Sequence, residues 1–273
     1  MKKILLSSLL ITASLQAQSA LGQYENFVIQ SPAKNVETLA TSKKMFKVGL
    51  DYFYEGSDAY SVSVINVPVQ ALVTKNVLLE ASLPYKIVSP DVGSSESGLS
   101  DIMIGAGYTM GLVGSDQARQ VFGLRYNIAG DEKVATAANV STFDLYWDTL
   151  GKIGQFSVGS GVLLSYALDD VNNKEIGSSS LLSINVGHDC LLTEELQTNA
   201  IISWYSKYSD ETIFGHTIPN SSHNLVDLTL KWNTLKLKDT PISFGAKIPL
   251  YATDITGQDL KTYTFFVNAA GLF

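Results

Sequence analysis

The sequence predicts an all-β chain that forms a transmembrane antiparallel β-barrel of the Gram-negative outer-membrane type, with about twelve strands. Three observations predict this fold. The chain begins with an export signal, apolar and polar side chains alternate along most of its length, and it ends on an aromatic residue, Phe273. The composition agrees with this interpretation, because 45% of the residues are hydrophobic and only 16% are charged.

The N-terminus carries the features of a secretory signal peptide. Lys2 and Lys3 form a charged start, residues 4–15 are apolar apart from serines and a threonine, and Ala17-Gln18-Ser19 is typical of a cleavage site. A membrane anchor would need roughly 18 or more apolar residues. We therefore expect a signal peptide over residues 1–19, an N-terminal segment over 20–43 and the barrel over 44–273.

A two-residue alternation supports the strands. In residues 226–233, for example, valine, two leucines and tryptophan alternate with aspartate, threonine, lysine and asparagine. Strands are expected, in chain order, at 44–55, 60–73, 77–88, 98–111, 118–129, 140–150, 155–168, 179–188, 195–208, 223–234, 241–250 and 261–273. The eighth has the weakest pattern, so ten or fourteen strands are alternatives. A phase change at Val64 and Ile65, followed by Pro68, predicts a bulge in the second strand.

The connections alternate between short and long, as in outer-membrane barrels. Short turns are expected at 74–76, 112–117, 151–154, 189–194 and 235–240, facing the periplasm. Longer polar loops at 89–97, 130–139, 169–178, 209–222 and 251–260, with a short one at 56–59, would face outside. An even number of strands then returns both ends of the barrel to the periplasmic side.

A soluble β-sandwich would also show alternation, with its apolar face turned inward. Aromatic residues at the strand ends favour lipid outside, because membrane barrels place aromatic girdles at the headgroup boundaries. The outer set is Tyr54, Tyr85, Tyr166, Trp204 and Tyr208, and the inner set is Tyr108, Trp147, Phe156 and Trp232. The expected surroundings are therefore the lipid and lipopolysaccharide of the outer membrane.

Two stretches resemble a known family. Residues 66–88 read NVPVQALVTKNVLLEASLPYKIV, with a strand that ends in Pro84-Tyr85, and residues 97–108 read SGLSDIMIGAGY. They resemble the outer-membrane transporters named after the meta-cleavage pathway of phenol degradation, the MetA-pathway-type β-barrels. Ser100 stands where that family's Gly-Leu-Gly-Asp pattern has its second glycine. The resemblance implies passage of small, often aromatic or hydrophobic compounds. Phe273 at the end of an alternating strand resembles the signal that the barrel-assembly machinery reads.

An enzyme, of the lipase or protease barrel type, is the rival class. The available bases are His188, His216 and His223, and no nucleophile elbow or zinc-binding helix motif accompanies them. His188 with Cys190 is too sparse for a zinc site. We therefore expect no enzyme activity, no metal and no cofactor. A purely structural or anchoring barrel remains an alternative. The formal net charge of −7 argues against nucleic acid as a partner.

The candidate site is the lumen. A twelve-stranded barrel should be narrower than an open porin, because eight strands are filled by side chains and sixteen leave a channel. The inward face carries seven cations and six anions, a near-neutral wall suited to passive uptake of a small-molecule solute. These pore-lining candidates are Lys47, Asp51, Glu80, Lys86, Asp101, Arg119, Arg125, Asp144, Asp148, Lys207, Asp227, Lys231 and Lys247.

Two further features modify this interpretation. The segment before the first strand shows no alternation, and Pro32 is expected to break any long helix there. It either folds into the lumen as a partial plug or forms a periplasmic tail. The outer loops are strongly acidic, which predicts a mouth that disfavours anions. Their charged residues are Asp58, Asp91, Glu96, Asp131, Glu132, Asp169, Asp170, Glu175, Asp210, Glu211, Asp254 and Asp259, against Lys133 and Lys174.

Overall fold

The structure is a computed structural model. It describes residues 27–56, 60–90, 93–111, 118–131, 141–168, 174–175, 178–189, 191–208, 211–213, 216–218, 224–235, 237, 239–252 and 262–273. The predicted signal peptide, Cys190 and His223 lie outside these residues, and so do most of the acidic residues of the outer loops.

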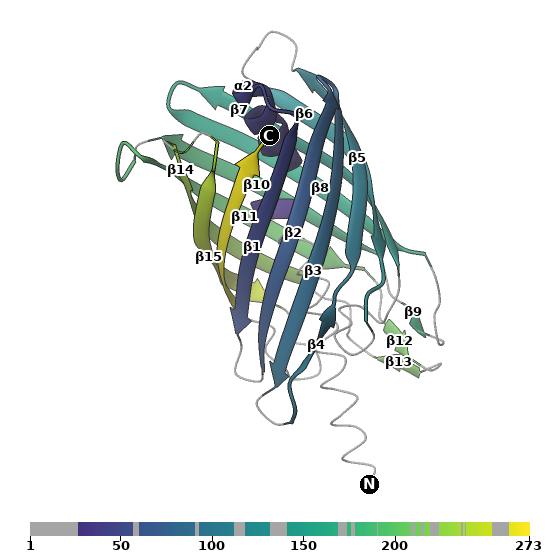
Figure 1. Cartoon of the computed structure of the whole chain (residues 1–273). Coiled ribbons are helices and arrows are strands. Elements are labelled where there is room, and N and C mark those ends of the chain that lie inside the picture. Colours follow the sequence, from purple (N-terminus) through teal and green to yellow (C-terminus); the bar gives the residue numbers. More distant parts are fainter. Residues whose placement is uncertain are drawn as a thin grey trace.

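Twelve antiparallel strands form a closed barrel, in which β1 pairs with β16 (Figure 1). The strands are β1 (Phe46–Gly56), β2 (Tyr60–Thr74), β3 (Val77–Pro90), β4 (Glu96–Leu99) with β5 (Ile102–Gly111) in one position, β6 (Arg119–Ile128), β7 (Thr142–Ile153), β8 (Phe156–Ala167), β10 (Ser179–Asp189), β11 (Leu196–Lys207), β14 (Asn224–Thr234), β15 (Ile242–Ala252) and β16 (Tyr263–Leu272). Loop strands β9 (Lys174–Glu175), β12 (Glu211–Ile213) and β13 (His216–Ile218) form a separate small sheet. The predicted fold class is confirmed, including the weakly patterned eighth strand, which is β10.

The β7–β8 connection is tighter than expected. Strand β7 continues to Ile153, which pairs with Phe156, so the turn consists of Gly154 and Gln155 alone. Gly154 has a φ of +62°, a backbone conformation that glycine adopts without steric cost. The prediction of a turn over 151–154 was wrong because Gly151 lies within the strand.

The predicted bulge at Pro68 is wrong as well. Strand β2 pairs with β3 in one continuous register from Tyr60 to Leu72, and the irregularity lies between Leu72 and Thr74. The neighbouring strand accommodates the proline by means of Gly49, since a Cβ at residue 49 would lie 2.8 Å from Pro68 Cγ. A missing side chain on β1 therefore makes room for the ring without bending β2.

The two stretches that carry the family resemblance lie side by side. The predicted strand over 98–111 is interrupted after Leu99, and β4 and β5 pair with β3 in registers that differ by one residue. At the break, the Ser100 backbone N–H donates to the Pro84 carbonyl at 2.9 Å. The end of the first stretch is thus hydrogen-bonded to the start of the second.

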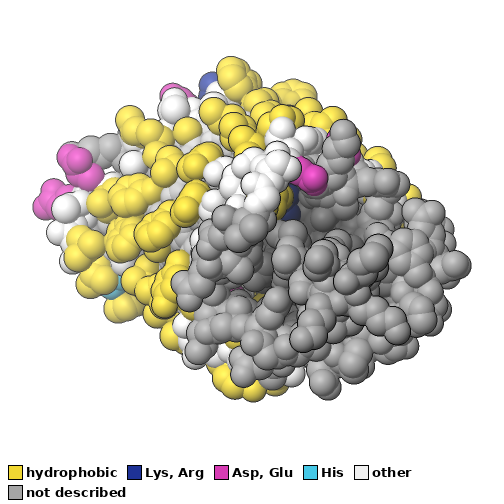
Figure 2. All heavy atoms as spheres, turned by 90° about the horizontal axis from the view of Figure 1, so that it is seen from below, with side chains coloured by type: hydrophobic (Ala, Val, Ile, Leu, Met, Phe, Trp, Pro, Cys, Tyr) yellow, Lys and Arg dark blue, Asp and Glu magenta, His cyan; other side chains and the backbone are white. Residues whose placement is uncertain are grey.

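The outer surface of the barrel is apolar. Side chains such as Leu50, Ile104, Ile184 and Val267 are about half exposed, and they alternate with buried inward residues along their strands. Figure 2 shows hydrophobic side chains around the flank of the barrel. Such a surface is stable only in contact with lipid, so the fold assigns the protein to the outer membrane of a Gram-negative bacterium. Among the described residues, no helix has both the length and the apolar character needed to span a membrane.

Helix α2 (Pro32–Ser42) lies inside the barrel, at the end that holds the C-terminus and the short turns (Figure 1). Pro32 occupies the first helical turn, and the Ser31 side chain accepts from the Lys34 backbone N–H at 3.2 Å. The prediction that Pro32 breaks any long helix is confirmed, because the helical residues 27–29 end before it and α2 begins at it. A proline is tolerated there because the backbone N–H that it lacks would have no intrahelical partner in the first turn. The helix contacts β2, β5, β6 and β7 and buries Val36 and Leu39 against them.

Candidate functional site in the barrel lumen

The predicted pore-lining residues all lie toward the inside of the barrel. Nine are buried: Asp51, Glu80, Lys86, Asp101, Arg125, Asp144, Asp148, Lys207 and Lys247. The other four, Lys47, Arg119, Asp227 and Lys231, are half-buried and face the same side of their strands. These side chains share the inward parity of their strands. That they line a pore stays a prediction and is taken up below as a proposal.

An ion pair on the inner wall of the barrel joins β3 to β6 over Gly105 of the intervening strand β5. Arg125 on β6 donates from Nε to Glu80 Oε1 at 3.1 Å and from Nη2 to Oε2 at 2.9 Å. The Tyr146 hydroxyl on β7 donates to the same Oε1 at 2.7 Å. The guanidinium also lies over the rings of Tyr146 and Phe27, at 4.8 and 5.3 Å from their centroids. This bidentate, ring-stacked geometry holds the arginine rigidly in the lumen.

Glycines in the wall make room for this cluster. A Cβ at Gly123 would lie 2.3 Å from Tyr146 Cζ, and one at Gly107 would lie 2.6 Å from the Tyr146 hydroxyl. A Cβ at Gly105 would lie 2.9 Å from Arg125 Cγ. The tyrosine ring and the arginine stem can therefore lie flat against β5 and β6, which explains the glycines that the sequence places in the fourth and fifth predicted strands.

The N-terminal segment is fastened to the wall by Asp148. This carboxylate on β7 accepts from the Ser31 hydroxyl at 2.5 Å and from the Ala33 backbone N–H at 2.8 Å. Both donors belong to the first turn of α2, where backbone N–H groups lack helical partners and the helix dipole favours a negative charge. A barrel side chain thus caps a helix that precedes the barrel in the chain.

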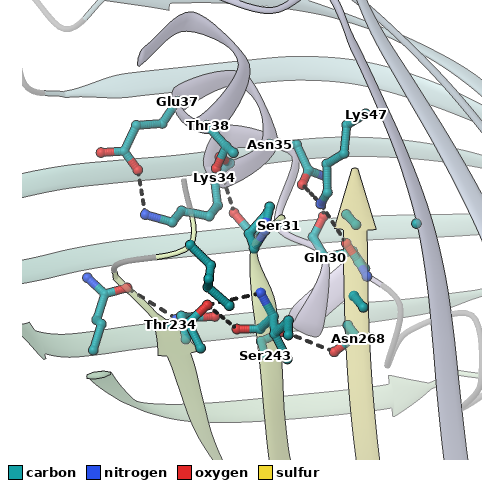
Figure 3. A pocket seen from close by; sticks show the side chains of 18 of the residues that line it. Gln30, Ser31, Lys34, Asn35, Glu37, Thr38, Lys47, Thr234, Ser243 and Asn268 are labelled. Carbon is teal, nitrogen blue, oxygen red and sulfur yellow. Dashed lines mark hydrogen bonds and ion pairs between the residues drawn. The ribbon is translucent and has the colours of Figure 1, made fainter. Parts of the chain in front are cut away.

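A second set of contacts fastens the residues just before α2. Gln30 donates to Asp51 Oδ1 at 2.9 Å and accepts from Lys47 Nζ at 3.2 Å. Lys47 also donates to Asn35 Oδ1 at 2.7 Å (Figure 3). Lys231 Nζ donates to the Ile29 carbonyl. Four predicted lumen charges therefore contact residues 29–35, counting Asp148.

Toward the other end of the strands, Lys247 lies 3.9 Å from Asp227 and 4.0 Å from Glu55. Glu55 is buried and faces inward, so it adds an acid to the six that the sequence predicted. Glu55 belongs to the same alternating set of β1 as Lys47 and Asp51, so the two-residue alternation could have identified it as an inward residue. Asp144 is held by an amide instead, since Asn127 donates to it at 2.7 Å.

Two cavities flank α2. One, of about 510 Å³, lies between the helix and the wall formed mainly by β1, β14, β15 and β16 (Figure 3). The other, of about 590 Å³, lies on the opposite face of the helix, where Arg119 and Thr109 help to line it. The inner part of the lumen is therefore divided by the helix and is not completely filled.

Several residues of the site were not identified from the sequence. Gln30 and Ser31 lie in a segment without alternation, although Ser31 followed by Pro32 is a recognisable helix start. Tyr146 faces inward on β7, between Asp144 and Asp148 of the same alternating set. The sequence predicts aromatic residues on the lipid side only, so Tyr146 is not identified from it. Phe27 is 1% exposed and packs against Tyr146, with ring centroids 5.8 Å apart. A membrane barrel of this width buries some aromatic residues inside as well.

The histidines form no catalytic arrangement in the part of the chain that the structure describes. His188 lies at the end of β10 and packs edge-on against the Phe156 ring at 4.6 Å between centroids. His216 belongs to β13, and no side-chain geometry is described for it. No group of three or more possible metal ligands comes together among the described residues.

Comparisons with known proteins bear on the fold. No protein-family model matches the chain, and no curated protein matches it in sequence. The crystal structure of the COG4313 outer membrane channel from Pseudomonas putida F1 superposes with a TM-score of 0.69 at 10% identity, covering 84% of this chain and 96% of that one. The chain folds as an outer-membrane β-barrel.

Two porins are also similar. A NanC porin superposes with a TM-score of 0.56 at 9% identity, covering 83% of this chain and 99% of the porin. A KdgM porin in complex with disordered oligogalacturonate gives 0.52 at 10% identity, with the same coverages. At these identities the likeness establishes the shared barrel architecture, and it leaves the solute of this chain to be argued from its own residues.

Proposed function

We propose that this protein is a channel for passive uptake of small molecules across the outer membrane, and that its solutes are aromatic or hydrophobic compounds. The observation that carries the proposal is the lumen itself. A barrel that only had to be stable in lipid would not need acidic and basic side chains inside. Here such side chains surround an interior that a helix divides into two cavities. The resemblance to MetA-pathway-type transporters and the likeness to solved channels support it.

The N-terminal segment gives the channel its form. Residues 27–43 act as a plug held by polar contacts from Asp148, Asp51, Lys47 and Lys231. Hydrogen bonds to charged groups contribute about 1.5–3 kcal/mol each, and water can replace the partners when the segment moves. None of these contacts belongs to the strand pairing, so the segment can shift without unfolding the barrel. Passage of a solute then requires displacement of α2 or movement between the helix and the wall.

One observation favours a second candidate, a purely structural or anchoring barrel. Phe27, Tyr146, Leu163 and Leu181 belong to an apolar cluster inside the barrel, together with residues of α2. A permanently filled interior of this kind would brace the barrel and conduct nothing.

Reconstitution in liposomes distinguishes the two candidates. The mature chain is compared with a variant that lacks residues 20–43, using uptake of aromatic acids, sugars and nucleosides and single-channel conductance. The channel function requires permeation above that of empty liposomes, and the plug requires a larger conductance in the deletion variant. If neither protein conducts although both are heat-modifiable, as folded barrels are, the structural role holds. Turnover of lipid or peptide would instead indicate an enzyme.

A further inference from the structure

The cavity of about 510 Å³ between α2 and the barrel wall is the size of a small-molecule site. It lies at the end of the barrel that carries the short turns. Its lining comes from α2, from the residues just before it, from the β14–β15 connection and from six strands of the wall, β1, β7, β11, β14, β15 and β16 (Figure 3). One part of the lining is charged and another is apolar, which is the composition that binds and orients an amphipathic ligand.

The charges that line the cavity do not cancel. Lys34 pairs with Glu37 at 2.7 Å, and Lys152 pairs with Asp189 at 2.5 Å. Lys47, Lys231 and Asp51 remain, two ammonium groups against one carboxylate. One negative charge would restore neutrality.

Both lysines are held by neutral acceptors. Lys47 donates to the side-chain oxygens of Asn35 and Gln30, and Lys231 donates to the Ile29 carbonyl. Within the described residues, no carboxylate lies at ion-pairing distance from either ammonium group. An ammonium group has three donors, so each lysine retains a donor for a further acceptor. A charge in a poorly solvated site gains most from an acceptor that is itself charged.

These two lysines also differ from most other cations of the lumen in being accessible. Lys86, Arg125, Lys207 and Lys247 are buried, whereas Lys47 and Lys231 are half-buried and border the cavity. The apolar part of the lining lies nearby, on the β14–β15 connection and the adjoining strands. It consists of Leu235, Leu237, Pro241, Ile242 and Ala269.

We infer that this cavity binds the carboxylate of a small organic acid with an apolar body, through Lys47 and Lys231. The carboxylate accepts from the two ammonium groups, and the apolar body lies against Leu235, Leu237 and Ile242. A monoanion matches the single surplus positive charge. This assignment deepens the proposed uptake function, because it gives the solute class a binding step at the periplasmic end, and it can be tested without transport.

The test uses isothermal titration of the full mature chain in detergent, with benzoate as the probe. We expect saturable binding of one benzoate per chain, weakened at least tenfold for benzamide, which keeps the ring and loses the charge. Sulfate tests the apolar part, and it should bind at least tenfold more weakly than benzoate. The affinity for benzoate should fall as the salt concentration rises.

Lys47→Gln and Lys231→Gln should each weaken benzoate binding at least tenfold. Lys75→Gln is the matched control, because it removes a lysine from the same end of the barrel but outside this cavity, and it should bind as the wild type does. Lys47→Arg and Lys231→Arg keep the positive charge and should retain benzoate binding. They test the assignment when a glutamine variant fails to fold. Heat-modifiability verifies folding in each case.

Three results would overturn the assignment: no saturable benzoate binding, equal affinity for benzamide, or unchanged affinity in both glutamine variants. Sulfate binding as tight as benzoate would mean a simple inorganic-anion site and would also overturn it. Failure of liposome uptake with intact benzoate binding would reject the transport proposal alone, whereas uptake without binding would reject only this inference.

Discussion

The Glu80 carboxylate and the Arg125 guanidinium form a two-point ion pair over Gly105 on the inner wall of the barrel, and their side chains are 1% and 6% exposed. Neither charge has access to bulk water. Tyr146 supplies a third hydrogen bond to the carboxylate, so the pair and the ring form one unit. The stability of the barrel should therefore depend on both partners together.

Removal of one partner should destabilise the barrel strongly. Glu80→Ala leaves Arg125 charged and uncompensated, which should cost about 3–5 kcal/mol in the free energy of unfolding. Urea titration in detergent measures it. The double variant Glu80→Met/Arg125→Met removes both charges of the pair and leaves neither partner uncompensated, so it should be close to the wild type. A double variant as unstable as Glu80→Ala would contradict this account.

Gly123→Ala should destabilise the barrel by about 1–3 kcal/mol, the usual cost of overpacking. The added Cβ would overlap the Tyr146 ring, from which it would be 2.3 Å away. Tyr146→Ala should remove most of that cost when combined with Gly123→Ala, and a double-mutant cycle on urea unfolding measures the coupling. Additive effects would show that the glycine serves some other purpose.

The lipid face is tested at Ile202, which is 52% exposed and lies between Ile184 and Leu228 on the neighbouring strands. Ile202→Arg should cost about 2–4 kcal/mol of stability in lipid or detergent. Asn233 lines the inner cavity and is the inward control, so Asn233→Arg should cost about 1 kcal/mol or less. Equal costs would mean that the two faces are exchanged.

Asp148→Ala should loosen the N-terminal segment. The variant loses the acceptor for the Ser31 hydroxyl and the Ala33 N–H, a capping contact typically worth about 0.5–2 kcal/mol. We expect more frequent or larger current steps in planar bilayers, with the barrel still heat-modifiable. Asp144→Ala, which removes an acid that α2 does not contact through any described hydrogen bond, is the control. Identical currents in both variants would argue against a movable plug.

The acidic outer loops predict cation preference, which should be measurable as a reversal potential across a potassium chloride gradient. Neutralising Asp131, Glu132, Asp169 and Asp170 together should weaken that preference at low ionic strength. At physiological salt, screening reduces the electrostatic effect of these charges beyond about 8 Å. The opposite effects of the acidic mouth and of the lysines of the inner cavity on ion selectivity therefore compete mainly in dilute buffer. Anion preference would show that selectivity is set inside, by cations such as Arg119.

The strands could be predicted because lipid outside and water or polar groups inside impose the same two-residue period on every one of them. On β14, for example, Leu228 is apolar and belongs to the lipid-facing set, whereas Lys231 is charged and belongs to the inward set. The packed interior could not be predicted in this way. Phe27 and Gln30 follow no period, and whether they enter the lumen depends on acceptors such as Asp51 and Asp148 on distant strands. The bulge predicted at Pro68 was wrong for a similar reason, because Gly49 on the adjacent strand supplies the space for the proline ring.

The pairing of β1 with β16 also has a consequence for the order of assembly. Lys47 pairs with Leu272, so the seam joins residues from the two ends of the barrel sequence and must form last. Helix α2 contacts β2, β5, β6 and β7, all from the first half of the barrel. We expect the helix to dock on this open, curved half-sheet and the later strands to wrap around it. A variant without the helix should then close its seam more slowly, even though the helix contributes no strand.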